Sequence, residues 1–268
     1  MMAIPLRTEE ELAKIRIACK LASDVLVMIE EHIKEGITTG ELDRICHEYI
    51  EKVQGGKPAN VGYHGFKHAT CISLNEVVCH GIPSFEKKLK KGDILNLDVT
   101  VIKDGYYGDN SKMYVVGEPG TRDKRLCEVT QECLYQGIRA VKPGVRLNSI
   151  GKAIQEYAEK EGFSVVREYC GHGIGDVYHA EPQVLHYYAD DGGVILRKGM
   201  VFTIEPMINA GKKEVRLMGD GWTVKTKDRS HSAQYEHEIV VTDDGCEVMT
   251  IREEEEKEGR ISRFMVNA

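Results

Sequence analysis

The sequence resembles itself at an interval of about 107 residues, and this repeat constrains the fold more than any other feature. Residues 36–52 align with residues 144–160, and residues 91–98 align with residues 198–205. Each copy has helical patterns followed by strand patterns, and a solenoid repeat would be much shorter. The repeat therefore predicts an α+β fold with two units related by pseudo-twofold symmetry. Chance similarity between two amphipathic segments is the alternative.

A capping box opens each of two predicted helices. Thr8 and Thr38 are each followed three residues later by a glutamate. In this arrangement the threonine and the glutamate satisfy backbone N–H groups that the first helical turn leaves unpaired. The apolar stripes that follow predict helices over residues 8–35 and 38–52.

The strand predicted over residues 94–102 carries a candidate metal ligand. Apolar and polar side chains alternate along it, which predicts a half-buried strand with Asp98 on its polar face. The Asp104–Gly105 pair favours a two-residue hairpin loop and a register that pairs Thr100 with Asp109. Asp98 and Asp109 then share a face as diagonal neighbours, with Cβ atoms about 7 Å apart. Such a pair can bind metal ions, although two exposed aspartates on a wet face would give the same pattern.

Three further residues have the chemistry of metal ligands. Glu205 and Glu236 each interrupt an apolar strand pattern, where an unpaired carboxylate is costly. The repeat places Glu205 over Asp98, a carboxylate over a carboxylate. His172 lies between two glycines, which leave its imidazole uncrowded on a tight loop. Taken alone, such a histidine is equally compatible with a purely structural role.

The composition is typical of a globular protein and argues against several partners. Hydrophobic residues make up 41% of the chain and charged residues 29%, with a net charge of -7. This acidic balance gives no general attraction to nucleic acid or to anionic lipid. The sequence shows no signal peptide and no membrane-spanning apolar stretch, so we expect a cytoplasmic protein.

Two other features are assigned structural roles. The eight cysteines include no CxxC pair, so reduced thiols are expected, most of them in the core. The acidic run Glu253–Glu256 is expected to be a helix face or a solvated tail.

The candidate ligands lie in blocks that resemble the methionine aminopeptidases of type I. These blocks are Asn96–Asp98, Gly108–Asp109, Gly171–Gly173, Thr203–Pro206 and Gln234–His237. Two longer blocks, Ser73–Pro83 and Tyr178–Pro182, are more specific than any single ligand, and the resemblance covers almost the whole chain. It implies the pita-bread fold, a pseudo-symmetric α+β arrangement of antiparallel sheet and flanking helices. Residues 1–268 are then one catalytic domain, with halves at about 8–118 and 119–252.

Two lengths favour the simple bacterial or organellar type I form. Too few residues precede Asp98 for the N-terminal domain of a prolidase. The segment between Glu205 and Glu236 is too short for the helical insertion of the type II enzymes.

The resemblance also implies a dinuclear metal site. Asp98 would bind one divalent ion, His172 and Glu205 the other, and Asp109 and Glu236 would bridge the two. Cobalt, manganese, iron and zinc all suit such ligands. A monovalent cation is further implied near Asn75, Val77 and Ser232.

Catalytic and substrate-binding roles follow from the same resemblance. His80, His179 and Glu205 are the implied catalytic residues, and both histidines would also contact substrate. The implied methionine pocket consists of Tyr63, Phe66, Cys71, Tyr178 and Trp222. Each aromatic residue taken singly is also compatible with core packing. The family commonly has tyrosine at Phe66 and cysteine at Asn60, so the pocket is expected to differ there.

The implied activity is removal of the initiator methionine from nascent proteins whose second residue is small. The partners would be nascent polypeptide N-termini at the ribosome, and the enzyme would be a monomer that binds neither nucleic acid nor membrane. The alternative is a non-catalytic pita-bread module that binds peptides or nucleic acid. The complete ligand set and the acidic charge favour the enzyme.

Overall fold

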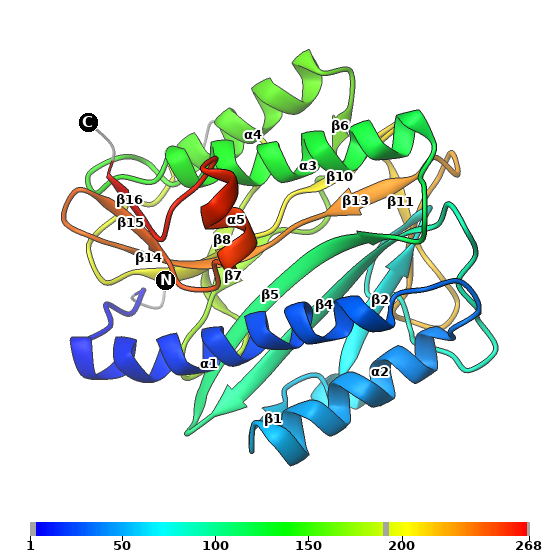
Figure 1. The fold of residues 1–268 in the computed structure, drawn as a ribbon. Coiled ribbons are helices and arrows are strands. Elements are labelled where there is room, and N and C mark those ends of the chain that lie inside the picture. The colour runs from blue at the N-terminus through cyan, green and yellow to red at the C-terminus, as the bar shows by residue number, and fades with distance from the viewer. Residues whose placement is uncertain (1–3, 190–192, 267–268) are drawn as a thin grey trace.

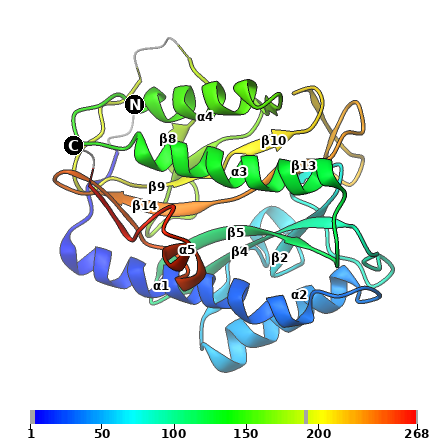
Figure 2. The same ribbon diagram turned by 45° about the horizontal axis from the view of Figure 1, so that its top comes forward.

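Two pairs of helices cover the strands in the computed structural model, which describes residues 4–189 and 193–266. Figures 1 and 2 show one pair over the N-terminal strands and the other over the later strands. The helices are α1 (Glu9–Ile29), α2 (Thr39–Glu48), α3 (Thr121–Arg139), α4 (Asn148–Lys160) and the short α5 (Glu253–Glu258). Helix α1 contacts β4 and β5, whereas α3 contacts β9, β10 and β13. The α+β prediction is confirmed.

Both predicted capping boxes are present at the starts of α1 and α2. The predicted end of the first helix is less accurate than that of the second. Helix α1 gives way to a 3-10 turn at Glu30–His32 rather than running to residue 35. Helix α2 continues through a π-helical turn, Tyr49–Val53.

The hairpin of β4 (Ile94–Lys103) and β5 (Tyr106–Val115) has the predicted register. Thr100 pairs with Asp109 across the two strands, and Asp98 pairs with Ser111. On its other edge β4 pairs with β1 (Lys57–Pro58) and β2 (Thr70–Leu74).

The prediction that this strand is half-buried is wrong, because both of its faces are covered. Leu97 and its apolar neighbours pack with residues of α1 and α2. On the polar face, Asn96 donates a hydrogen bond to the Gln234 carbonyl from the C-terminal part of the chain. A second layer therefore closes the face that local alternation assigned to solvent.

The remaining strands form three antiparallel sheets. The largest runs in the order β16–β15–β14–β9–β7–β8, and the smaller two run β13–β10–β6 and β11–β12–β3. The bounds are β3 (Val77–Cys79), β6 (Ser164–Val165), β7 (Gly171–Gly173), β8 (Ala180–Val184), β9 (Val201–Ile204), β10 (Met207–Asn209), β11 (Val215–Leu217), β12 (Val224–Thr226), β13 (Ser232–Gln234), β14 (His237–Val241), β15 (Gly245–Val248) and β16 (Phe264–Val266).

The N-terminal and C-terminal strands meet where β3 pairs with β12, and again at an isolated bridge between Ser111 and Glu236. Across it, the Glu236 N–H donates to the Ser111 carbonyl at 3.2 Å. Strand β4 begins at Ile94 and β9 at Val201, which is the interval of the sequence repeat. Asp98 and Glu205 consequently approach the bridge from corresponding strands.

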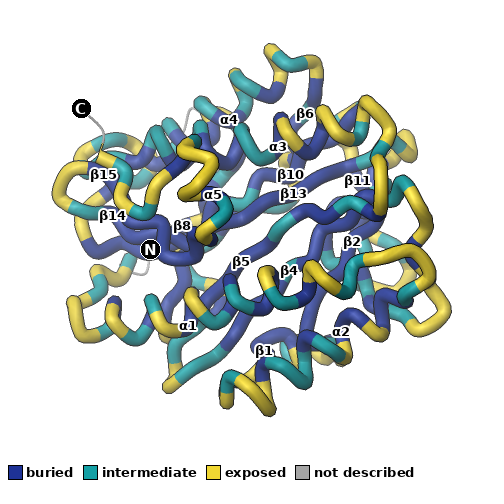
Figure 3. The backbone as a smooth tube through the Cα atoms, viewed as in Figure 1, coloured by how far each residue is buried: buried dark blue, intermediate teal, exposed yellow. Residues whose placement is uncertain are grey.

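The core lies between the helices and the strands. Figure 3 shows the central strands buried along most of their length, with exposed residues concentrated in loops and outer helix turns. The largest apolar cluster joins α3 and α4 to β9 and β14, and a second joins α1 and α2 to β2 and β4. Within the described residues, no helix is long and apolar enough to cross a membrane.

Candidate functional site

A cavity of about 600 Å³ opens beside the Ser111–Glu236 bridge. Its volume is in the range of small-molecule sites. All twelve residues singled out from the sequence line it: Tyr63, Phe66, Cys71, His80, Asp98, Asp109, His172, Tyr178, His179, Glu205, Trp222 and Glu236. The structure thus brings together residues that are up to 173 positions apart, while their individual roles remain predictions.

The acid cluster at the base of the cavity draws on both parts of the chain. We define it as Asp98, Asp109, Glu205 and Glu236, together with His172. Ligand atoms of Asp109, His172 and Glu236 lie within 4.8 Å of one another. The His172 Nε2 atom is 3.6 Å from Asp109 Oδ2 and 3.6 Å from Glu205 Oε1. These separations leave space for a cation that several donor atoms share.

The electrostatics of the acid cluster favour such a cation. Burial raises the pKa of Asp98 to about 7 and that of Glu205 to about 8. Burial and the neighbouring carboxyls raise the pKa values of Asp109 and Glu236 well above their usual range. No lysine or arginine is among the described groups that shift these four pKa values. A buried carboxylate group without a counter-charge is strongly disfavoured, so the cluster calls for positive charge from outside the chain.

His172 is held as a neutral imidazole. Burial lowers its pKa to about 3, with a smaller contribution from His179. Its Nδ1 lies 3.2 Å from the Gly173 carbonyl, so a hydrogen on Nδ1 leaves the Nε2 lone pair facing the acids. The flanking glycines are needed for close packing. A Cβ atom at Gly171 would lie 2.3 Å from the Thr203 carbonyl oxygen, and one at Gly173 would lie 2.1 Å from the Glu181 carbonyl oxygen.

Hydrogen bonds orient Glu205 from three sides. Thr203 Oγ1 donates to Glu205 Oε1 at 2.8 Å, and Gln234 Nε2 lies 3.2 Å from Oε2. The backbone N–H of Glu205 donates to His186 Nε2 at 3.1 Å. Because burial lowers the pKa of His186 to about 3, its ring is neutral and Nε2 is an acceptor.

Aromatic rings form the opposite wall of the cavity. The Phe66 and Trp222 rings meet edge to face at 4.9 Å, and Tyr63 lies 4.9 Å from Tyr178. His179 lies between this wall and the acid cluster, 4.1 Å from the Tyr178 ring and 4.1 Å from the His172 ring. The cavity therefore has an apolar end and an acidic end.

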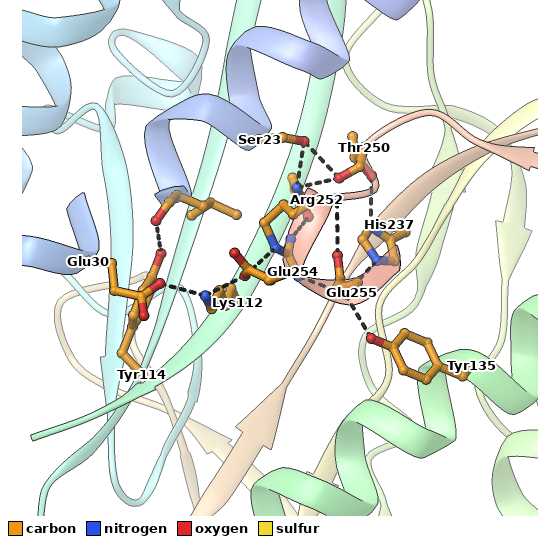
Figure 4. Close-up of polar contacts among 12 residues, drawn as sticks. Ser23, Glu30, Lys112, Tyr114, Tyr135, His237, Thr250, Arg252, Glu254 and Glu255 are labelled. Atoms are coloured by element: carbon orange, nitrogen blue, oxygen red, sulfur yellow. Dashed lines mark hydrogen bonds and ion pairs between the residues drawn. The ribbon is translucent and has the colours of Figure 1, made fainter. Parts of the chain in front are cut away.

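Beyond the cavity wall, on the helix side of the same strands, lies a second buried polar cluster (Figure 4). We call His237, Arg252, Glu255 and the groups they bind the paired cluster. Glu255 Oε1 lies 3.1 Å from His237 Nε2 and 2.8 Å from an Arg252 guanidinium nitrogen. Burial alone would raise the pKa of Glu255, but the charges of His237 and Arg252 lower it below its usual range.

This arrangement corrects the expectation for the acidic run near the C-terminus. Glu255 is only 1% exposed, because α5 directs it into the protein, where Tyr135 also donates to it at 2.8 Å. The other three glutamates of the run are more exposed, so the expectation of solvation is wrong specifically at Glu255.

Sequence reasoning missed several residues that shape the cavity. Thr100 and Thr203 position carboxyls, yet threonine is an ordinary strand residue. Tyr169 lines the cavity and lies 5.5 Å from His80. The available signal was its place just before Gly171–Gly173, which form strand β7 and not the predicted tight loop. All eight cysteines are free as expected, and three of them line the cavity.

Comparison of sequences relates the chain to enzymes of known class. The sequence model of metallopeptidase family M24 matches residues 13–243. A methionine aminopeptidase of Haemophilus influenzae is 74% identical over 267 residues, covering 99% of this chain and 100% of that protein. The methionine aminopeptidase of Escherichia coli K12 is 61% identical over 254 residues, covering 95% and 96%.

Comparison of structures gives the same grouping. The crystal structure of methionine aminopeptidase from Rickettsia prowazekii has a TM-score of 0.91 and 50% identity, covering 93% of this chain and 100% of that one. A prolidase from Pyrococcus furiosus has a TM-score of 0.75 at 23% identity, and the match covers 66% of the prolidase. At that identity the prolidase shares the fold alone.

Proposed function

The chain belongs to metallopeptidase family M24 and, within it, to the methionine aminopeptidases, and we propose that two divalent ions in the acid cluster drive its release of N-terminal methionine. It is a metalloaminopeptidase with the pita-bread α+β fold of that family. The observation that carries the proposal is the convergence of four buried carboxyls and one neutral imidazole, with no lysine or arginine among the described residues that line the cavity.

The donor set fits a pair of divalent ions. Four carboxylates would balance the charge of two such ions, and mixed oxygen and imidazole ligation suits cobalt, manganese, iron or zinc. Asp98 would hold one ion, and His172 with Glu205 the other. Asp109 and Glu236 would bridge them. When bound, such ions lower the pKa of water and polarise a carbonyl group.

Three side chains would handle protons and the substrate carbonyl. Glu205 would accept a proton from the attacking water and pass it to the leaving amine. His179, whose pKa burial lowers to about 4, is neutral and would donate a hydrogen bond to the oxygen of the scissile carbonyl. His80, whose pKa burial also lowers, would lie near the leaving nitrogen.

The apolar end of the cavity would hold the methionine side chain. Tyr63, Phe66, Cys71, Tyr178 and Trp222 supply its wall. Because the acids and His80 crowd the next position, the second residue of the substrate would have to be small.

Further parts of the proposal concern the setting of the enzyme. We expect it to act in the cytoplasm as a monomer on nascent chains at the ribosome. The division into halves at about 8–118 and 119–252 stays a prediction. So does a monovalent cation near Asn75, Val77 and Ser232, where the Ser232 N–H donates to the Asn75 carbonyl at 2.8 Å.

Peptide turnover and metal content together test the proposal. Met-Ala-Ser should be cleaved in the presence of manganese or cobalt, and Met-Leu-Ser hardly at all. Asp109→Ala should lose both ions, whereas Glu247→Ala, which removes a buried carboxylate paired with Arg16, should keep them. Equal turnover of the two peptides would refute the small-residue specificity. Two tightly bound ions in Asp109→Ala would refute the bridging role.

A further inference from the structure

A chain of hydrogen bonds runs from Asn60 through the methionine pocket to the acid cluster. The Tyr178 hydroxyl donates to Asn60 Oδ1 at 2.5 Å and lies 2.6 Å from Thr100 Oγ1. Thr100 Oγ1 in turn donates to Asp109 Oδ1 at 2.8 Å. Two consecutive oxygens in the wall of the cavity therefore connect a carboxamide to a proposed bridging ligand.

The chain is shielded from water along its length. Thr100 has no exposed surface, Asn60 is 5% exposed and Tyr178 is 9% exposed. Water cannot readily replace a lost hydrogen-bond partner at such positions. Losing one of these hydrogen bonds therefore costs more free energy than losing one at the surface.

Tyr178 is the residue through which Asn60 can influence the pocket. Its ring stacks on Tyr107 at 5.5 Å and lies 4.1 Å from the His179 ring. Its hydroxyl, the polar end of the ring, is held by Asn60 and Thr100. A change in the orientation of this hydroxyl thus reaches both the aromatic wall and the carboxyl cluster.

The number of hydrogens explains why a carboxamide is useful at residue 60. Tyr178 and Thr100 have one hydroxyl hydrogen each, yet three oxygen–oxygen contacts must be satisfied. When Thr100 donates to the Asp109 carboxylate, Thr100 and Asn60 compete for the phenol hydrogen. A carboxamide accepts from the phenol through Oδ1 while its NH₂ group donates to the Ala69 carbonyl, so Oδ1 stays fixed toward the phenol and shares its hydrogen with Thr100.

We propose that Asn60 is a positioning residue that fixes the Tyr178 hydroxyl and, through it, ties the wall of the methionine pocket to the Thr100 bond on Asp109. This inference rests on the proposed function, which assigns Tyr178 to the pocket and Asp109 to the metal pair. Asn60 itself also donates to the Ala69 carbonyl at 3.3 Å, which anchors it to the backbone.

A double-mutant cycle separates this role from simple packing. Asn60→Leu should lower kcat/KM for Met-Ala-Ser about 3- to 10-fold, the usual effect of one buried hydrogen bond. It should also weaken manganese binding measured by calorimetry. Because Asn60 acts through the phenol, both effects should vanish in a Tyr178→Phe background. An equal loss of kcat/KM, or of manganese affinity, in both backgrounds would overturn the proposal.

Two further variants serve as a matched control and as a replacement for Asn60→Leu. Asn209→Leu makes the same exchange at a buried asparagine that bonds the Lys212 carbonyl, and its effect should be the same with and without Tyr178→Phe. Asn60→Ser replaces Asn60→Leu in the cycle if the leucine variant does not fold. Wild-type protein that releases no methionine would refute the proposed function, whereas the manganese-binding arm would still decide the role of Asn60.

Discussion

The acid cluster and the paired cluster adjoin each other at two points along the chain but balance their charge in different ways. Asp109 and Glu236 line the cavity, while the next residues, Asn110 and His237, join the buried network with Arg252 and Glu255. Successive strand residues point to opposite faces, so each bridging ligand has a neighbour in the other cluster.

The difference lies in where the counter-charge originates. In the paired cluster, Arg252 and His237 hold the pKa of Glu255 below its usual range. In the acid cluster, burial raises all four carboxyl pKa values, and neighbouring carboxyls raise three of them further. A buried acid therefore indicates a metal site only when no cationic partner is found for it, including among residues distant in sequence.

Removing metal should have the largest effect, because only the acid cluster depends on ions for its counter-charge. Chelation should abolish methionine release and lower the melting temperature, because ions bind the folded site and stabilise it by mass action. At an ion concentration of about 100 times Kd the stabilisation is about 2.7 kcal/mol, or about 5 to 10 °C for a chain of this size. Calorimetry on protein whose metal content is verified would test this, and identical melting temperatures with and without metal would contradict it.

Breaking the paired cluster should cost stability and leave metal in place. Glu255→Ala removes the buried carboxylate that Arg252 and His237 both bind, for which the expected loss is about 3 to 5 kcal/mol. Glu253→Ala is the matched control on the same helix, since its side chain is 87% exposed and its loss should cost no more than about 1 kcal/mol. Urea unfolding gives both values. A loss of metal from folded Glu255→Ala protein would show that the two clusters are not separable.

His179 in the cavity and His237 in the paired cluster should respond differently to the same substitution. His179→Ala should keep both ions and lose about 10² to 10³ in kcat, the usual effect of removing one oxyanion donor. His237→Ala should instead lower stability while turnover per folded molecule stays near normal. Metal content, melting temperature and kcat on the two variants test these roles. Unchanged kcat in metal-loaded His179→Ala would remove His179 from catalysis.

The smallest expected effect is a pH dependence of the metal-free protein. Asp98 and Glu205, with pKa values raised to about 7 and about 8, hold protons in the folded state that they lose in the unfolded state. Buried histidines with lowered pKa values act in the opposite direction below about pH 6.5, so the stability should fall as pH rises from about 7 to about 8, where these carboxyls dominate. Metal should oppose this fall, because it binds ionised carboxylates. Melting curves across that range give the slope, and a rising melting temperature without metal would have the wrong sign.

The features that the sequence predicted best depend on neighbouring residues. The Asp104–Gly105 turn sets the register that pairs Thr100 with Asp109, and the capping boxes set two helix starts. The convergence of His172 with Glu205 and Glu236 was expected through the family resemblance, because no local pattern brings such distant residues together.

The failures have a common physical cause. Glu255 was expected in solvent, because its partner His237 lies on a different strand that no local pattern identifies. The polar face of β4 was assigned to water, because its cover comes from residues more than a hundred positions away. The link from Asn60 to Asp109 was missed for the same reason, since it passes through Tyr178.

The bridge between Ser111 and Glu236 joins residues far apart in sequence, which sets the order in which the site can be assembled. Asp98 and Asp109 come together in a local hairpin, which needs only a short loop to close. Glu236 reaches them only after the C-terminal strands have docked, a slower step because it closes a long loop. During synthesis, the growing chain cannot contain the complete ligand set until nearly nine-tenths of it has been made. Metal is thus acquired by an almost finished protein and does not direct the early stages of its folding.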